Sequence, residues 1–212
     1  MVITMFSLGM AGEAVLSVLA TKRLSLFIVL VSFGVIIAPL LWFPFFTTKA
    51  YPGQHLINAL AGVMLGPWWA AAAAILIGII RNILGIGTVY AFPGGIPGGV
   101  VVGLVHLLTR RSKRPAIRYL AALTEPIGTV LIGGTLSLVM VAPIIGDPRL
   151  LGAVEHYGLW HFLPIFWSGW ALSSIPGSIA GYLILLALDR IGVMSRIPVL
   201  QAAVQATRID RS

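Results

Sequence analysis

The feature that most constrains this chain is a series of apolar runs, each about as long as a lipid bilayer is thick. Such runs lie near Leu24–Phe45, Pro67–Leu84, Tyr119–Ile145 and Phe162–Leu188. The sequence is 58% hydrophobic and only 9% charged, which is too apolar for a soluble domain of 212 residues. Because a single helix satisfies its own backbone in hydrocarbon, we expect an all-α integral membrane protein.

Two shorter apolar segments, His55–Gly66 and Gly98–Thr109, do not reach across a bilayer alone. Each follows a Pro/Gly-rich stretch, Tyr51–Gly53 and Phe92–Pro97 respectively, which we interpret as a non-helical lead-in. Non-helical backbone at membrane depth must be buried in protein or line a cavity. If both lead-ins lie within the fold, the segments become crossing helices, and six transmembrane helices are expected.

The basic residues divide unevenly between the two sides of this six-helix arrangement. One side carries Lys22, Arg23, Arg110, Arg111, Lys113, Arg114, Arg118, Arg190, Arg196, Arg208 and Arg211, whereas the other carries Lys49, Arg81 and Arg149. The positive-inside rule therefore predicts a multi-pass cell (plasma) membrane protein with both termini in the cytoplasm. Because these residues sit at the ends of apolar runs, the net charge of +8 does not indicate nucleic-acid binding.

Three regions are expected along the chain. Residues 1–21 form a hydrophobic or interfacial N-terminal extension, which lacks the basic start of a signal peptide and is either a seventh helix, a surface helix or the product of an upstream start. Residues 22–192 form the six-helix membrane domain. Residues 193–212 form a cytoplasmic tail, in which Ile197–Thr207 is predicted to be a short interfacial helix.

Small and polar residues recur at every fourth position along several expected spans. The ridges are Gln54, Asn58, Gly62 and Gly66; Glu125, Thr129, Gly133 and Ser137; Gly169, Ser173, Gly177 and Gly181; and the pair Gly99 and Gly103. Small residues let helices approach closely in a membrane, so these ridges are predicted to face protein rather than lipid. Their Gln, Asn and Glu members need hydrogen-bond partners that glycine cannot supply.

Polar residues at the outer ends of the second and third spans are predicted to converge. They are Gln54, His55, Asn58, Arg81 and Asn82. Trp167 and Trp170 lie deeper in the sixth span, where one of them could stack on a ring. An apolar pocket with these groups suits a small heteroaromatic ligand. The simpler alternatives are interhelical hydrogen bonding and, for Arg81, a side chain that reaches to the interface.

Glu125 does not fit this outer cluster easily. Counting from Arg118 at the cytoplasmic interface places Glu125 about 10 Å deep, on the far side of the bilayer. His106 lies at a similar depth, so one expectation is a His106–Glu125 hydrogen bond within the bundle. The alternative is that the helix begins lower and Glu125 reaches the pocket.

No motif for enzymatic chemistry is present. The sequence lacks a phosphate-binding loop, a zinc-binding His-Glu-x-x-His and a Gly-x-Ser-x-Gly nucleophile motif. It has no cysteine and only six acidic residues, so we expect neither a metal site nor an enzyme. A membrane enzyme acting on lipid or isoprenoid substrates remains an alternative, as does a self-sufficient carrier in which Glu125 and His106 relay protons.

Five ordered motifs between about Lys22 and Leu188 resemble those of the ThiW family. They are PGQHLINALAGVMLGPWW from Pro52, IRNILGIGT from Ile80, AFPGGIPG from Ala91, EPIGT from Glu125 and SSIPG from Ser173. The family comprises substrate-binding S components of energy-coupling factor (ECF) transporters, associated with the thiazole precursor of thiamin. The resemblance implies capture of hydroxyethylthiazole or a related thiamin precursor from outside, beneath a lid formed by Phe45–Gly53.

The resemblance also implies partners and site residues. The partners are a transmembrane coupling protein and two cytoplasmic ATPases, which would use the ATP, while this chain binds no cofactor. The implied substrate-binding residues are Gln54, His55, Asn58, Arg81, Asn82, Glu125, Trp167 and Ser173. The family's Ala-x-x-x-Ala docking face on the first helix corresponds to Ile28 and Ser32, and Ser25 extends its small-residue face. Thiazole, pyrimidine and thiamin all remain possible ligands.

Overall fold

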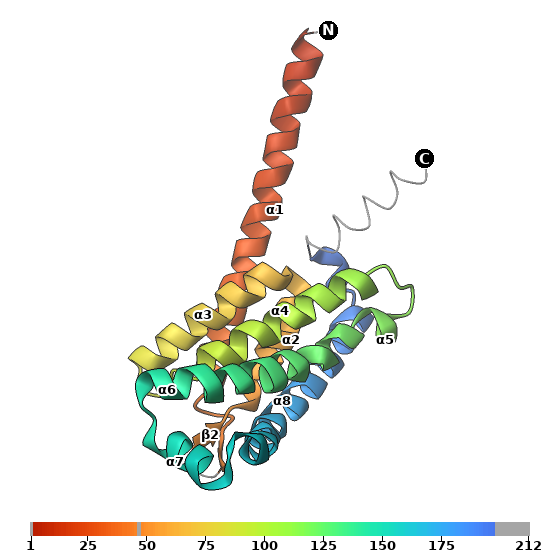
Figure 1. Ribbon diagram of the computed structural model, residues 1–212. Coiled ribbons are helices and arrows are strands. Elements are labelled where there is room, and N and C mark those ends of the chain that lie inside the picture. The colour runs from red at the N-terminus through yellow and green to blue at the C-terminus, as the bar shows by residue number, and fades with distance from the viewer. Residues whose placement is uncertain (1, 46–47, 198–212) are drawn as a thin grey trace.

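The computed structural model describes residues 2–45 and 48–197, with the side chains of residues 18–44 and 50–197. The helices form a bundle around one short central helix (Figure 1). Of the interfacial helix expected over Ile197–Thr207, only the first residue lies within the described residues.

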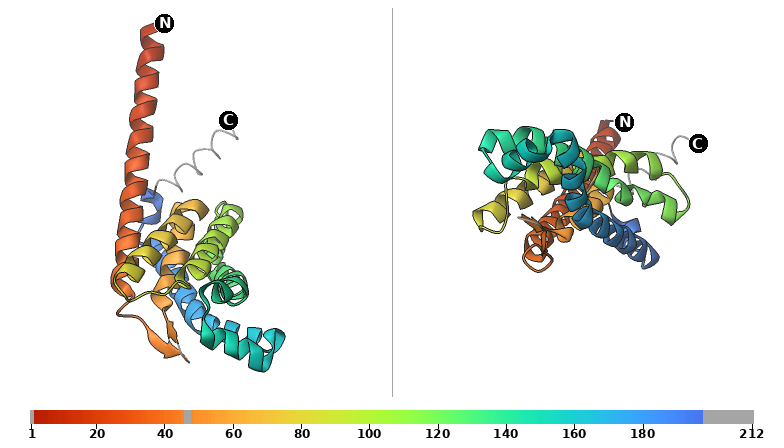
Figure 2. Two further views of the ribbon diagram at one scale, coloured as in Figure 1. Left: turned by 60° about the vertical axis from the view of Figure 1, so that its left-hand side comes forward. Right: turned by 60° about the horizontal axis from the view of Figure 1, so that its bottom comes forward.

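The first helix, α1 (Val2–Ile37), is longer than a membrane requires. Its 36 residues correspond to roughly 54 Å at 1.5 Å per residue, against about 30 Å of hydrocarbon. Its N-terminal part projects beyond the bundle, as Figures 1 and 2 show. The N-terminal extension therefore continues the first helix and does not form a separate seventh helix. The apolar candidate span within α1 is Val18–Ile37.

The central helix is α2 (Pro52–Leu65), which is joined to α3 (Pro67–Ile83) by Gly66. Gly66 has φ 90°, a conformation that glycine adopts without strain. A proline stands in the first turn of each helix, where its missing N–H leaves no bond unmade. Every residue of α2 from Gly53 onward is buried, because α1, α3, α4 and α8 all pack against it.

The lead-in before the fourth span is helical, which corrects our interpretation of Phe92–Pro97. Helix α4 runs over Ala91–Thr109 and includes this stretch. Pro93 lies in the first turn, where helix amides are unpaired anyway, and Pro97 removes one interior hydrogen bond. Pro52 and Gly53, which we also expected outside a helix, form the start of α2. Pro52 and Pro93 thus occupy first-turn positions that suit proline, and only Pro97 lies inside a helix against its local preference.

The fifth span is one helical segment of changing geometry. It comprises α5 (Pro115–Arg118), the 3₁₀ turn η1 (Leu120–Thr124), the π-helical stretches η2 (Ile127–Gly134) and η3 (Ser137–Val141), and α6 (Ala142–Ile145). Glu125 lies between η1 and η2. Widened π-turns are often found at functional sites.

Two elements lie outside the bundle at one end (Figures 1 and 2). The antiparallel hairpin of β1 (Phe43–Phe45) and β2 (Thr48–Ala50) overlaps the expected lid at Phe45 and over the whole of β2. The helix α7 (Pro148–Tyr157), which we did not expect, precedes α8 (Leu159–Arg190). A short turn, η4 (Met194–Arg196), follows α8.

Four helical segments in the described part of the chain are long and apolar enough to cross a membrane: Val18–Ile37, Ala91–Thr109, Pro115–Ile145 and Leu159–Arg190. They support the expected all-α membrane fold. Helix α3, with 17 residues, and α2, with 14, are shorter, so six crossings remain a prediction.

The small-residue ridges face protein, as predicted. A Cβ at Gly103 would overlap the backbone of Pro67, and one at Gly181 would lie 2.7 Å from the Cβ of Ala59. A Cβ at Gly128 would overlap the backbone carbonyl of Pro97, which joins α4 closely to η2. These contacts let α2, α3, α4, η2 and α8 approach closely enough to bury polar side chains between them.

We expect the Gly128→Ala variant to unfold at a lower temperature than the wild type. The new methyl group meets backbone rather than a movable side chain, and overpacking of this kind typically destabilises by about 1–3 kcal/mol. Gly152→Ala is the matched control, because a Cβ there meets no atom within 4 Å. Thermal unfolding in detergent checks this, and equal losses for both variants would contradict it.

Candidate binding site

A cavity of about 340 Å³ opens between the bundle and the two outer elements. Ala50 and Tyr51 line it from the hairpin side, and Leu150 and Ala153 from α7. The wall from α8 is largely aromatic, with Phe162, Phe166 and Trp170. The polar residues on its surface are Gln54, His55, Arg81, Thr88, Tyr90, Asp147, Arg149 and Ser173. An apolar enclosure with a few placed polar groups is typical of a small-molecule site.

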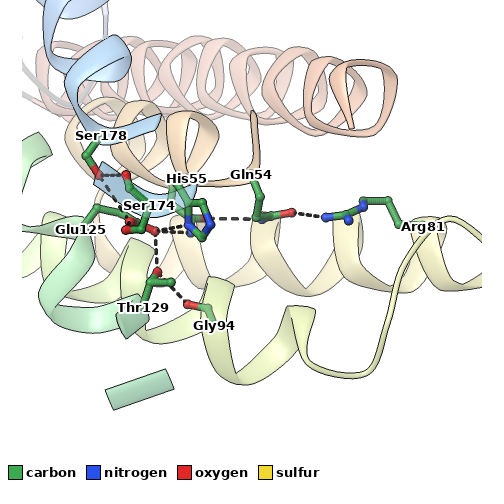
Figure 3. A network of polar contacts seen from close by, with 9 residues as sticks. Gln54, His55, Arg81, Gly94, Glu125, Thr129, Ser174 and Ser178 are labelled. Atoms are coloured by element: carbon green, nitrogen blue, oxygen red, sulfur yellow. Dashed lines mark hydrogen bonds and ion pairs between the residues drawn. The ribbon is translucent and has the colours of Figure 1, made fainter. Parts of the chain in front are cut away.

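The carboxylate of Glu125 lies just beneath this cavity and is fully buried. Side chains from three elements surround it, as Figure 3 shows. Oε1 accepts hydrogen bonds from His55 Nδ1 at 3.0 Å, Asn58 Nδ2 at 2.8 Å and Thr129 Oγ1 at 2.5 Å. Oε2 accepts from the hydroxyls of Ser174 and, at 3.3 Å, Ser178. The hydroxyls of Thr129 and Ser178 have one proton each and also reach the carbonyls of Gly94, at 3.0 Å, and Ser174, at 2.7 Å, so the carboxylate shares these two donors. Its other three donors suit an ionised carboxylate, which can only accept.

A chain of hydrogen bonds links Glu125 to a buried cation. Arg81 Nη1 donates to Gln54 Oε1 at 2.9 Å, Gln54 Nε2 donates to Asn58 Oδ1 at 3.4 Å, and Asn58 Nδ2 donates to Glu125. A guanidinium can only donate, so it fixes which way both amides point. The chain therefore begins on a positive charge and ends on a negative one, and bonds so aligned polarise one another.

His55 connects the buried carboxylate to the cavity. Its Nδ1 faces a carboxylate oxygen, so Nδ1 carries a proton. The ring also lines the cavity, and its Nε2 has no hydrogen-bond partner among the described residues. The contact with Glu125 thus sets the orientation of the ring, as a carboxylate commonly does for histidine.

Arg81 is 2% exposed, although it is one of the residues that line the cavity. The guanidinium carbon lies 4.1 Å from the ring centre of Tyr51, a favourable cation–π arrangement. The hydroxyl of Tyr51 donates to the carbonyl of Ile86 at 2.7 Å, which holds the ring in place. Arg81 Nε is buried with no hydrogen-bond partner. One of our alternatives was that the Arg81 side chain reaches to the membrane interface. The structure contradicts it, because the side chain is buried within the bundle.

Helix α8 contributes Trp170 and Ser173 to the cavity wall. A Cβ at Gly94 would lie 2.6 Å from the Trp170 ring, so this glycine admits the indole to the cavity wall. Ser173 is 3% exposed, and its Oγ is buried without a partner. A buried hydroxyl of this kind is available to a bound molecule.

Asp147 and Tyr90 hold α7 at the mouth of the cavity. Tyr90 donates to Asp147 Oδ2 at 2.7 Å, and Asp147 caps α7 by accepting from the amides of Arg149 and Leu150. Burial alone would raise the pKa of Asp147, but these hydrogen bonds lower that pKa below its usual value. Burial and the contact with Asp147 raise the pKa of Tyr90. At neutral pH the pair is thus a carboxylate and a protonated phenol.

The structure does not bring every expected residue to the cavity. Asn82 donates to the carbonyls of Gly78, at 2.8 Å, and Thr88, at 3.2 Å, and so joins the end of α3 to the following loop. Trp167 donates from Nε1 to Thr135 at 3.2 Å, and Trp170 takes the position on the cavity wall. Ser25, Ile28 and Ser32 are all exposed on α1.

The expected His106–Glu125 hydrogen bond is wrong. His106 Nδ1 pairs instead with the carbonyl of Arg118 at 3.1 Å. Glu125 meets His55 and Asn58 instead, because α2 is short and fully buried, so that residues near its start lie within reach of the carboxylate.

Several site residues were missed by the sequence analysis. The hydrogen-bond network around Glu125 includes Ser174 and Ser178, and the cavity is lined by Tyr90, Asp147 and Arg149. A signal for the serines did exist, because Ser174 and Ser178 stand four residues apart on one helix face. Nothing local marked Tyr90 or Asp147, which are 57 residues apart and meet only in the fold.

The family model of ThiW, described as a thiamine-precursor transporter protein, matches residues 24–191. The chain belongs to the ThiW family. Comparison with curated proteins and with solved structures gives no significant match. ThiW membership makes the chain a membrane component of thiamine-precursor transport, and the matched region contains every polar residue described at the cavity.

We expect Glu125→Gln to destabilise the protein by about 3 kcal/mol or more, since removing one partner from a buried charged network leaves the others unpaired. The amide would place an N–H₂ group against donors that now share the carboxylate. Glu155→Gln, the same change at an exposed position on α7, is the control. Thermal or denaturant unfolding in detergent measures the difference, and similar stability of the two variants would argue against this role of Glu125.

Proposed function

We propose that this chain is the substrate-binding S component of an ECF transporter and captures hydroxyethylthiazole or a related thiamin precursor. The single observation that carries the proposal is the cavity, which combines the indole of Trp170 with Arg81, His55 and the free hydroxyl of Ser173. A flat heteroaromatic ring can stack on the indole, and its polar substituents can meet these groups. Membership of the ThiW family supports this class of ligand.

The position of the cavity fits uptake from outside. The cavity opens where α2 begins. At the other end of α2, Arg23 Nη2 donates a hydrogen bond to the carbonyl oxygen of Leu65 at 2.5 Å. Arg118 pairs with Asp189, near the end of α8, at 3.5 Å. By the positive-inside rule the basic end faces the cytoplasm, so the cavity faces outward. The hairpin and α7 then cover it, which widens the proposed lid to two elements.

The proposal assigns ATP hydrolysis to partner subunits. The sequence has no phosphate-binding loop, so a coupling protein and two cytoplasmic ATPases would supply the energy. The exposed face of α1 that carries Ser25, Ile28 and Ser32 is the proposed contact with the coupling protein. The alternative of a proton-coupled carrier required a relay between His106 and Glu125. The structure does not support that relay, because His106 pairs with the carbonyl of Arg118 and Glu125 pairs with His55.

Binding is the first test. We expect the purified protein to bind 4-methyl-5-(2-hydroxyethyl)thiazole or a close relative in calorimetry, with thermal stabilisation. Loss of an aromatic contact is worth about 0.5–1.5 kcal/mol, so Trp170→Leu should weaken binding roughly two- to tenfold. Trp167→Leu is the matched control, because Trp167 does not line the cavity. No binding of thiazole, pyrimidine precursor or thiamin would refute the proposed function.

Uptake tests the dependence on partners. In a host that lacks the coupling protein and ATPases, we expect no accumulation of radiolabelled precursor, and co-expression of these subunits should restore it. Dissipating the proton gradient while ATP is maintained should then leave uptake unchanged. Uptake without the subunits that follows the proton gradient would instead support a self-sufficient carrier.

A further inference from the structure

Arg81 presents a problem that the proposed function does not by itself solve. Its guanidinium is almost completely buried, and burying a charge is unfavourable unless an opposite charge or several hydrogen bonds compensate. Within the part of the chain that the structure describes, its side-chain hydrogen bond goes to the neutral amide of Gln54 and its face rests on Tyr51. No described carboxylate oxygen lies within 4.0 Å of it.

The two carboxylates nearest the cavity are already engaged elsewhere. Glu125 is already in hydrogen-bond contact with five side chains and is separated from Arg81 by two amide side chains. Asp147 accepts from Tyr90 and from the first amides of α7, and its Oδ1 lies 3.7 Å from Arg149 Nε. Neither carboxylate is therefore in contact with Arg81.

The hydrogen-bond chain places its positive end at the cavity. Arg81 lines the cavity, whereas Glu125, at the negative end, is fully buried and is not among the residues that line it. Arg81 Nε is a buried donor with no partner, and Ser173 Oγ, also unpartnered, lines the same cavity. Both groups can donate a hydrogen bond to a ligand, and the guanidinium adds a positive charge.

We propose that the ligand binds as an anion, and that Arg81 receives its acidic group. This inference rests on the proposed function and specifies its substrate class: a thiazole that carries a carboxylate or a phosphate, rather than the neutral alcohol. The planar fork of a guanidinium suits both acidic groups, because each offers two oxygens to parallel N–H donors. Binding of the anion would provide the opposite charge that Arg81 lacks in the free protein.

The test compares three thiazoles that differ in one substituent. They are 4-methyl-5-(2-hydroxyethyl)thiazole, its phosphate monoester, and 4-methylthiazole-5-acetic acid, in which a carboxylate replaces the alcohol carbon. Calorimetry on the full-length protein in detergent should show at least one anion binding about tenfold or more tightly than the alcohol. The anion that binds more tightly identifies the acidic group as carboxylate or phosphate.

Variants of Arg81 assign this preference to the guanidinium. In Arg81→Gln the anion should lose about tenfold or more in affinity, while the affinity for the alcohol changes much less. Arg81→Lys keeps the positive charge but lacks the planar guanidinium, so it should retain part of the preference for the anion over the alcohol. This variant provides the readout if Arg81→Gln does not fold. Arg190→Gln removes an exposed cation near the end of α8 and should change nothing.

Two results would overturn this inference and leave the proposed function standing. One is an alcohol that binds the wild type as tightly as either anion. The other is an equal loss of affinity for all three compounds in both Arg81 variants, which would indicate a purely structural role. If none of the thiazoles, the pyrimidine precursor or thiamin binds the wild type, the proposed function itself fails.

Discussion

The carboxylate of Glu125 lies where α2, η2 and α8 meet, and much of the interior is arranged around it. A buried charge without compensation would be too unfavourable for a membrane protein to retain. Here α2 contributes His55 and Asn58, η2 contributes Thr129, and α8 contributes two serines. Each donor is correctly placed only when its helix is at the right depth and rotation. The network therefore specifies how three helices pack as well as stabilising one charge.

Close packing of backbone makes that network possible. A Cβ at Gly98 would overlap the side chains of Thr129 and Glu125, and a Cβ at Gly177 would lie 2.8 Å from the Cβ of His55. Glycine at these positions lets polar side chains occupy space that a larger residue would fill. The small-residue ridges and the polar network are thus two parts of one arrangement, because helix contact excludes lipid while the donors satisfy the charge.

The same network links the interior to the cavity. Because Arg81 can only donate and Glu125 can only accept, the two amides between them have one consistent orientation. His55 is oriented from the same carboxylate and lines the cavity. The polar wall of the cavity is therefore preorganised by a charge that a ligand does not contact. Preorganisation of this kind lowers the free-energy cost of ordering side chains on binding.

The sequence alone determined the membrane class, the approximate apolar segments and the family. It also singled out Gln54, His55 and Arg81, which line the cavity, and Asn58, which belongs to the hydrogen-bond network. These follow from the composition, from the spacing of small and polar residues along each segment, and from the ordered motifs, all of which can be seen in the sequence itself. Tertiary structure decided that Glu125 pairs with His55 rather than His106, that Trp170 rather than Trp167 lines the cavity, and that α7 covers it. The physical reason is that depth and rotation depend on packing between helices. The 14 residues of α2 cover only about 21 Å, so the surrounding helices, rather than α2's own length, set how deep its polar residues lie.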